Sequence, residues 1–119
     1  MGRNNIVGAW GEQIAAAYLA KKRYKLVAAN YRCRFGELDL IVRNRTHLVF
    51  VEVKLRSSTE YGLPREFVDR RKQEKLRITA EAYLAQEDLD CDARFDVAEV
   101  YADPSGRGKA RIEYIENAF

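Results

Sequence analysis

The chain has 119 residues, 47% hydrophobic and 33% charged, a balance that suits one compact domain over residues 1–119 with one core. No apolar run is long enough to cross a bilayer and no signal-peptide core begins the chain, so we expect a cytoplasmic protein with no membrane partner. One histidine and two distant cysteines argue against a zinc site and against hydrolases that need a histidine base.

The charges are sorted along the chain. Residues 1–77 contain 17 Lys or Arg against 8 Asp or Glu, a net charge of +9, whereas residues 78–119 contain 4 against 10, a net charge of −6. A basic half of this kind predicts a face that attracts a polyanion, with the acidic segment 87–92 turned away from it. An ordinary solvated surface is the alternative, and we favour nucleic acid as the partner.

The first half of the chain predicts a helix and three strands. Residues from about 7 to 23 have helical periodicity, followed by a strand over residues 24–31. Residues 36–42 and 48–54 alternate with period two around a polar break, which is typical of a hairpin. The helix is expected to bury a stripe of four residues and to widen it with three more: Trp10, Ile14, Ala17 and Tyr18, then Ala15, Ala16 and Leu19.

The second half predicts a helix and two strands. Asp69 is a good N-cap for a helix over residues 70–86, and strands follow over residues 94–101 and 110–115. Between these elements we expect a polar loop over residues 55–64 and a turn over residues 103–106. Ser57, Ser58 and Thr59 in the loop are able to donate to phosphate, but loops commonly have this composition, and an ordinary polar loop is the favoured interpretation. This order predicts an α/β domain in which helices flank a central mixed β-sheet.

The hairpin carries charged residues where a strand should be apolar. Asp39 lies on its first strand, and Glu52 and Lys54 lie on its second, each flanked by Val, Ile, Leu or Phe. A carboxylate buried without a partner costs several kcal/mol, so a metal ion, a lysine or both must neutralise these acids. The alternative is a cross-strand charge cluster that stabilises the sheet by about 0.2 to 1 kcal/mol.

An acid on one strand followed by acid-any-lysine on the next resembles the catalytic signature of the PD-(D/E)XK nucleases, although Leu38 stands where the name-giving proline would be. The resemblance implies that Asp39 and Glu52 bind Mg²⁺ or Mn²⁺, with the backbone carbonyl of Val53 between them. Lys54 would orient the attacking water or stabilise developing charge. Hydrolysis of a phosphodiester needs such an ion to polarise the phosphate and activate water.

Further motifs narrow the resemblance and cover nearly the whole chain. They are Gly11-Glu12-x-x-Ala15, Asn30-Tyr31-Arg32, the two hairpin strands, Arg94-Phe95-Asp96-Val97 and Asn117-Ala118-Phe119. Together they are similar to the bacterial YraN-like family, thought to be related to Holliday junction resolvases. The resemblance implies a restriction-endonuclease-like fold, DNA recognised by structure rather than sequence, and a homodimer. Lys22-Arg23 stand where we expect a glycine to close the first helix, so its exit is expected to differ locally.

Several supporting roles have two interpretations each. Glu12 is either a third carboxylate at the metal, as in the junction resolvases, or an acid that favours the helix dipole. Glu37 is either a further ligand or an ion-pair partner, and Lys72 or Gln73 is the candidate helper on the second helix. Asp96 is expected to be structural. The candidate contacts with nucleic-acid phosphates, for some of which an ion pair or a solvated face is the alternative, are Arg32, Arg34, Arg56, Arg70, Arg71, Lys72 and Lys75.

The sequence therefore predicts a metal-dependent endonuclease that acts on DNA, on branched DNA in repair or recombination if the resemblance extends that far. Two other classes stay open. One is an accessory protein of the same fold that binds nucleic acid without cleaving it, and the other is a protein-interaction module in which the acids and Lys54 only neutralise one another.

Overall fold

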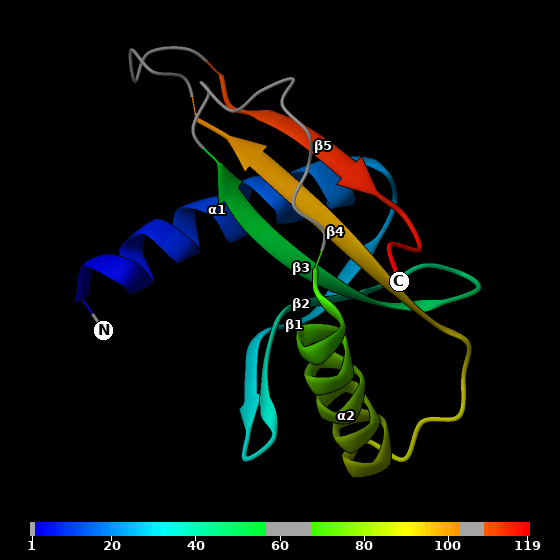
Figure 1. The fold of residues 1–119 in the computed structure, drawn as a ribbon. Helices are drawn as coiled ribbons and strands as arrows, with labels where there is room; N and C mark the ends of the chain where they lie inside the picture. The colour runs from blue at the N-terminus through cyan, green and yellow to red at the C-terminus, as the bar shows by residue number, and fades with distance from the viewer. Residues whose placement is uncertain (1, 57–67, 103–108) are drawn as a thin grey trace.

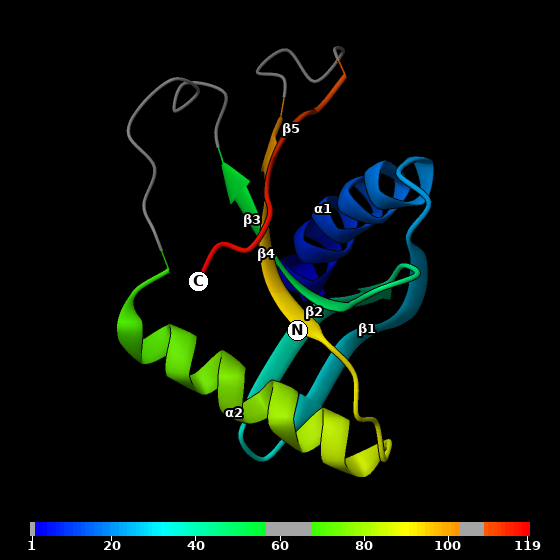
Figure 2. The ribbon, with the colours of Figure 1, turned by 90° about the vertical axis from the view of Figure 1, so that its right-hand side faces the viewer.

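A five-stranded mixed sheet with a helix against each face forms the frame of the molecule (Figures 1 and 2). The computed structural model describes residues 2–56, 68–102 and 109–119, with side chains from residue 9 onward. The predicted α/β fold is confirmed and is compatible with a restriction-endonuclease-like domain. In chain order the elements are α1 (Gly2–Lys21), β1 (Lys25–Cys33), β2 (Gly36–Arg43), β3 (Leu48–Arg56), α2 (Arg70–Gln86), β4 (Ala93–Tyr101) and β5 (Arg111–Ile115).

The strands lie in the sheet in the order in which they occur in the chain. β3 and β4 are parallel and joined through α2, whereas β1–β2, β2–β3 and β4–β5 are antiparallel pairs. Residues 57–64 of the predicted polar loop and the predicted turn over residues 103–106 lie outside the described residues. No helix in the described part of the chain is long and apolar enough to span a membrane.

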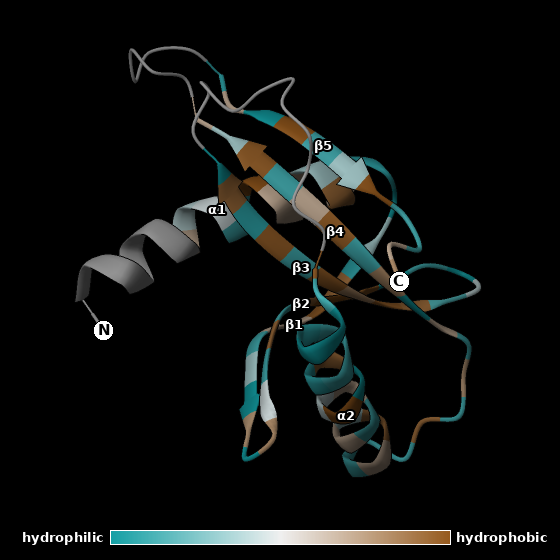
Figure 3. Ribbon diagram, viewed as in Figure 1, coloured by the Kyte–Doolittle hydropathy of each residue, from teal (hydrophilic) through white to brown (hydrophobic). Residues whose placement is uncertain are grey.

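Period-two alternation along β3 divides the core into two layers. Val49 and Val51 pack with α1, while Phe50 packs on the other face with α2. Figure 3 shows hydrophobic residues along β3 and β4 in the middle of the sheet. The α1 layer contains Ala15, Leu19, Leu40, Val42, Val49, Val51 and Ala98, and the α2 layer contains Leu38, Ile41, Leu48, Phe50, Val68, Leu76, Ala80, Tyr83 and Val97.

The buried stripe of α1 differs from the predicted one, and the helix begins at Gly2 rather than near residue 7. Trp10 is 40% exposed and Ala17 is also exposed, so the prediction was wrong for both. The residues that α1 buries fully against the sheet include Ala15 and Leu19, which had been expected only to widen the stripe, while Tyr18 of the predicted stripe is partly buried against the same core.

Small residues on α1 let the helix approach the sheet closely. A Cβ atom added to Gly11 would lie 2.7 Å from Leu55 Cδ2 on β3 and 3.6 Å from Val53 Cγ1. Gly11, Ala15 and Leu19 are spaced four residues apart, so they form one line along the helix. The large Trp10 side chain therefore cannot occupy this contact line.

The exit from α1 is a Schellman motif without a glycine. The Tyr24 N–H donates to the Leu19 carbonyl and the Arg23 N–H to the Ala20 carbonyl, each at 3.0 Å. Arg23 has φ 71°, a left-handed conformation that L side chains adopt at a cost. The chain therefore leaves the helix through a standard motif, and the expected local difference is backbone strain at Arg23.

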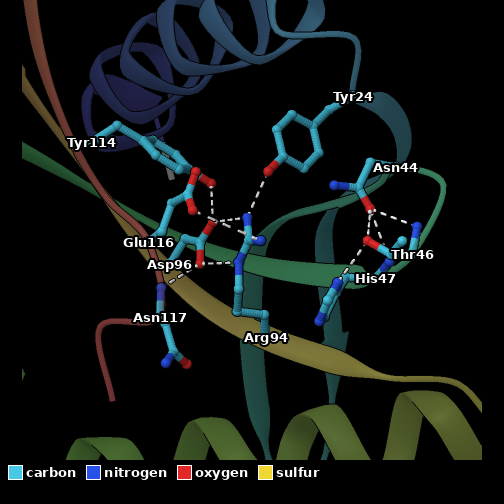
Figure 4. Close-up of polar contacts among 9 residues, drawn as sticks. All are labelled: Tyr24, Asn44, Thr46, His47, Arg94, Asp96, Tyr114, Glu116 and Asn117. Carbon is cyan, nitrogen blue, oxygen red and sulfur yellow. Dashed lines mark hydrogen bonds and ion pairs between the residues drawn. The ribbon is translucent and has the colours of Figure 1, made fainter.

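A buried carboxylate, Asp96, ties together three parts of the chain (Figure 4). Arg94 donates to both of its oxygens, at 2.9 and 2.8 Å, and also to the Tyr24 hydroxyl at 2.6 Å. The Tyr114 hydroxyl and the Asn117 N–H donate to Asp96 at 2.6 and 2.9 Å. Burial, followed by the hydrogen bond to Asp96 and then by the Asp96 charge, raises the pKa of Tyr114. Asp96 is structural, as predicted.

Replacement of Arg23 by glycine should stabilise the protein. We expect Arg23→Gly to raise the free energy of unfolding by about 1 kcal/mol, because glycine adopts the left-handed conformation without steric cost. Urea denaturation measures this change. The matched control is Arg23→Ala, which removes the same side-chain charge but keeps the unfavourable Cβ; an equal gain in this variant would show that charge, not backbone strain, is responsible.

Candidate active site

The candidate site lies where β2 and β3 stop pairing. Their ladder runs from Arg43–Leu48 to Leu40–Val51 and ends there, while β3 continues to Arg56 beside β4. The N–H of Val53 therefore has no β2 carbonyl to bind. The Asp39 carboxylate takes that place and accepts the Val53 N–H at 2.8 Å.

A kink in β1 accompanies the divergence of β2 and β3. Asn30 has φ 54° within β1, at the position that faces Asp39 between the paired residues Tyr31–Leu38 and Ala29–Leu40. Strict alternation would put Leu38 and Leu40 on the same face, but Leu38 packs in the α2 layer and Leu40 in the α1 layer. The β1–β2 hairpin is therefore twisted at Asn30 and Asp39, so that the residues on either side of this point present opposite faces to the core.

This twist brings the end of the β1–β2 hairpin, residues 31–38, against α2. The Tyr31 ring meets the Tyr83 ring edge-on with centroids 5.1 Å apart, and its hydroxyl donates to Gln86 Oε1 at 2.8 Å. A Cβ atom on Gly36 would lie 2.9 Å from Thr79 Oγ1, so the hairpin end also passes close to the helix. These contacts hold the segment that carries Asp39.

Asp39 and Glu52 form a pair of carboxyl groups in an apolar recess. Leu38, Phe50 and Leu76 line the recess together with both acids. Burial, followed by the charge of Glu52 and a hydrogen bond between the two side chains, raises the pKa of Asp39 to about 8, although the Val53 N–H opposes the shift. Two acids this close cannot both be ionised cheaply, so Asp39 stays protonated near neutral pH.

Lys72 brings a positive charge from α2 to this pair. Its Nζ lies 2.5 Å from Glu52 Oε2, and the Lys72 side chain is 51% exposed. Burial lowers the pKa of Lys72, but the hydrogen bond to Glu52 and the charges of Glu52 and Asp39 outweigh burial and raise it. Of the two predicted candidates on this helix, Lys72 contacts the acids.

The start of α2 is fixed close to the site by two local contacts. The Asp69 carboxylate accepts the Lys72 N–H at 2.8 Å, which confirms the predicted N-cap. The Gln73 side chain donates to the Val68 carbonyl at 2.7 Å, so Gln73 closes the helix start instead of contacting the acids. The helix therefore directs its positive end towards this part of the sheet.

Glu12 of α1 acts on the carboxyl pair through its charge. Burial raises the pKa of Glu12, and a hydrogen bond with the Asn30 side chain opposes that shift. Glu37 and Arg32 act on it electrostatically, and Glu12 itself adds to the raised pKa of Asp39. Among the described residues, no three His, Cys, Asp or Glu side chains are grouped to hold a metal ion. Glu12 as a metal ligand stays a prediction.

Lys54 follows Glu52 by two residues and so lies on the same face of β3. Its register partner on the parallel neighbour β4 is Glu99, which is 1% exposed. Glu99 Oε2 accepts Arg56 Nε at 2.8 Å. Arg56, predicted to bind phosphate, therefore has a side chain that is only 11% exposed and already paired.

The other predicted phosphate contacts occupy two surfaces. Arg32 pairs with Glu37 at 2.9 Å, with both side chains more than half exposed, and the Arg34 guanidinium lies over the Phe35 ring at 4.8 Å. Arg70, Arg71, Lys72 and Lys75 are exposed on the first turns of α2, where Glu74 is exposed as well. Glu37 in this structure is an ion-pair partner, the role that was one of its two interpretations.

The chemistry of these groups fits a small, hard cation. Mg²⁺ usually takes one or two carboxylates and completes its shell with water and substrate oxygens. Asp39 and Glu52 supply two such carboxylates. The raised pKa of Asp39 indicates that this group lacks a positive charge that would stabilise its ionised form. A divalent cation would replace the proton on Asp39 and lower the pKa of that carboxyl group.

Two residues of the site were missed by sequence reasoning. Asn30 is a poor strand former inside a predicted strand, which is the one signal that could have marked the kink. Glu99 is an acid in an apolar strand, the same signal that marked Glu52. Its position beside Lys54 depends on the parallel register of β3 and β4, which the sequence does not contain.

Fold and site together define a mixed α/β protein with a paired-carboxyl site on its central sheet. The model of the Uncharacterised protein family UPF0102 matches residues 11–100, and the chain belongs to this family, as the YraN-like resemblance predicted. It is 45% identical over 114 residues to the UPF0102 protein of Caldanaerobacter subterraneus, covering 95% of this chain and 93% of the relative. With the UPF0102 protein of Syntrophus aciditrophicus it shares 47% identity over 120 residues, covering 100% and 92%.

The kink at Asn30 predicts different outcomes for two small replacements. We expect Asn30→Gly to retain the backbone conformation and to lose only the hydrogen bond to Glu12, whereas Asn30→Ala should cost about 1–2 kcal/mol more in free energy of unfolding. Urea denaturation of both variants checks the difference. Equal stability of the two would contradict a left-handed Asn30.

The carboxyl pair predicts a stability that falls as pH rises. Between the ordinary aspartate pKa of 3.8 and the folded value of about 8, the folded protein holds a proton that the unfolded chain has released. The free energy of unfolding should therefore decrease across this range, by up to about 1.4 kcal/mol per pH unit. Asp39→Asn keeps an oxygen for the Val53 N–H and should remove this decrease; denaturation at several pH values measures it.

Proposed function

We propose that this protein is a metal-dependent endonuclease that hydrolyses phosphodiester bonds in DNA and acts in the cytoplasm. The observation that carries the proposal is the pair of the half-buried Asp39 and the buried Glu52, which are hydrogen-bonded to each other, with the pKa of Asp39 raised to about 8. Such a pair lowers the stability of the folded protein, and replacing one acid would relieve the repulsion. A pair that has been kept is therefore expected to serve a function. A bound cation makes both acids favourable.

Each residue has a role in this proposal. Asp39 and Glu52 would hold Mg²⁺ or Mn²⁺, which supplies the polarisation of the phosphate and the activation of water when bound. The Val53 N–H keeps the Asp39 carboxylate in position. Lys72, now paired with Glu52, becomes available to the scissile phosphate once the cation compensates that acid. Lys54 stabilises charge on the same face, and Glu12 supports the pair from α1.

The surrounding charges suit a substrate recognised through its backbone. Arg70, Arg71 and Lys75 are exposed on the first turns of α2, the same end that brings Lys72 to the acids. Phosphate contacts of this kind hold a nucleic acid without reading its bases. The resemblance to junction resolvases extends the proposal to branched DNA in repair or recombination and to a homodimer that matches the symmetry of a junction.

One observation favours a second function. The ion pair between Lys72 and Glu52 neutralises part of the acidic cluster without any metal, as expected of a nucleic-acid-binding or protein-interaction module that does not cleave. The two proposals differ in what the acids contribute. In a non-catalytic protein, Asp39→Asn should leave binding unchanged and should not alter any response to divalent cations.

Cleavage assays test the proposed activity. Duplex, single-stranded, flapped and four-way-junction DNA should be cut only with Mg²⁺ or Mn²⁺, and we expect Asp39→Asn and Glu52→Gln each to lower the rate by at least about a hundredfold. The matched control is Glu81→Gln, an exposed acid on the far half of α2, which should cut normally.

Thermal unfolding provides a readout that does not depend on substrate. Mn²⁺ should raise the unfolding midpoint of the protein and of Glu81→Gln, but not that of Asp39→Asn, because only an intact pair binds the cation tightly. Salt-sensitive DNA binding without cleavage and without a metal-induced shift would favour the accessory protein.

A further inference from the structure

A cavity of about 560 Å³ opens beside the turn between β2 and β3, away from the carboxyl pair. It shares no lining residue with that site. Tyr83 of α2 lines the cavity, whereas Lys72 of the same helix contacts Glu52. Eleven residues of helix separate the two, or about 16 Å at about 1.5 Å per residue. The cavity is therefore a second, independent feature of the molecule.

Cations converge on this cavity from two strands and a turn. Lys25 of β1 and Arg43 of β2 are register partners, so two like charges lie directly opposite each other, and Arg45 lines the same space. Like charges in this arrangement destabilise a sheet. No ion pair engages Lys25, Arg43 or Arg45 within the part of the chain that the structure describes. An anion would relieve the repulsion.

The turn that carries Arg45 and His47 is held in place by its own hydrogen bonds (Figure 4). Asn44 Oδ1 accepts from the Thr46 N–H at 3.0 Å, from the Thr46 hydroxyl at 3.2 Å and from the His47 N–H at 2.8 Å. The Asn44 N–H donates to the His47 carbonyl at 3.1 Å. A turn fixed in this way loses little conformational freedom when a ligand binds, which favours affinity.

The remaining walls have the composition of a small-molecule site. Leu26 and Leu89 line the cavity although they are 57% and 42% exposed, and the buried Tyr83 lines it as well. Glu87 adds one hydrogen-bond acceptor. Ligand cavities of roughly 300–1,000 Å³ combine apolar walls with a few convergent polar groups in this manner. Apolar walls suit a flat ring, the cations suit phosphate, and the carboxylate suits a hydroxyl or amino group.

We propose that this cavity binds a nucleoside phosphate, with the phosphate against Lys25, Arg43 and Arg45 and the base along Leu26 and Leu89. Glu87 accepts a hydrogen bond from the sugar or the base. The inference does not depend on nuclease activity at Asp39 and Glu52. The nucleoside phosphate is either a free mononucleotide or the phosphorylated end of a nucleic-acid strand, since both present the same chemistry.

Titration calorimetry with AMP and with a 5′-phosphorylated dinucleotide tests the proposal, in chelator so that no divalent cation bridges the ligand to the carboxyl pair. We expect saturable binding of at least one ligand, weakened roughly tenfold or more by the double replacement Lys25→Gln and Arg43→Gln, because bonds to charged groups are lost. The matched control, Lys21→Gln with Lys109→Gln, removes two exposed cations that line neither the cavity nor the proposed nucleic-acid surface, and it should bind normally.

Cys91 provides a second readout because it lines the cavity and is exposed. In a Cys33→Ser protein, which leaves Cys91 as the single thiol of the 119 residues, the ligand should slow alkylation of Cys91. Tighter binding of AMP identifies a free nucleotide, and tighter binding of the dinucleotide identifies a strand end. No binding by either, equal weakening in the control, or binding without protection of Cys91 overturns the proposal.

Discussion

The hydrogen bond from the Val53 N–H to the Asp39 carboxylate is the contact on which the candidate site depends. It exists because the ladder between β2 and β3 ends at Leu40 and Val51, which leaves a strand N–H without a backbone acceptor. A buried N–H must find a partner, and the Asp39 side chain is the partner available. Asp39 is thereby held beside Glu52, in a recess too apolar for two charges.

Asp39 and Asp96 are acids in strands of one sheet, and their surroundings give them opposite characters. Asp96 receives four hydrogen bonds, two of them from the Arg94 guanidinium, so its charge is compensated, and it joins β4 to Tyr114 of β5 and to Asn117. Asp39 receives one backbone N–H and faces a second acid. The surroundings of Asp96 stabilise the fold. The surroundings of Asp39 leave the negative charge of the carboxyl pair only partly compensated, because Lys72 pairs with Glu52 alone.

Hydrophobic periodicity was sufficient to predict most of the fold. The α/β class, the hairpin, the bounds of α2 and its Asp69 cap all follow from apolar spacing and local capping chemistry, which act over a few residues. The stripe of α1 was predicted less well, because the close approach at Gly11 depends on Leu55, far away in the sequence. The left-handed conformation of Asn30 could not be predicted from side-chain alternation, because alternation assumes a regular strand.

The sequence by itself determined which residues carry the chemistry: Asp39, Glu52 and Lys54 stand out because charges in apolar strands need partners, and alternation is a local property. Only the tertiary structure decided which groups meet them. The choice of Lys72 over Gln73, the engagement of Arg56 by Glu99, and the convergence of Lys25, Arg43 and Arg45 depend on strand register and on where α2 crosses the sheet. Those relations join residues that are distant in the chain, so they appear only once it has folded.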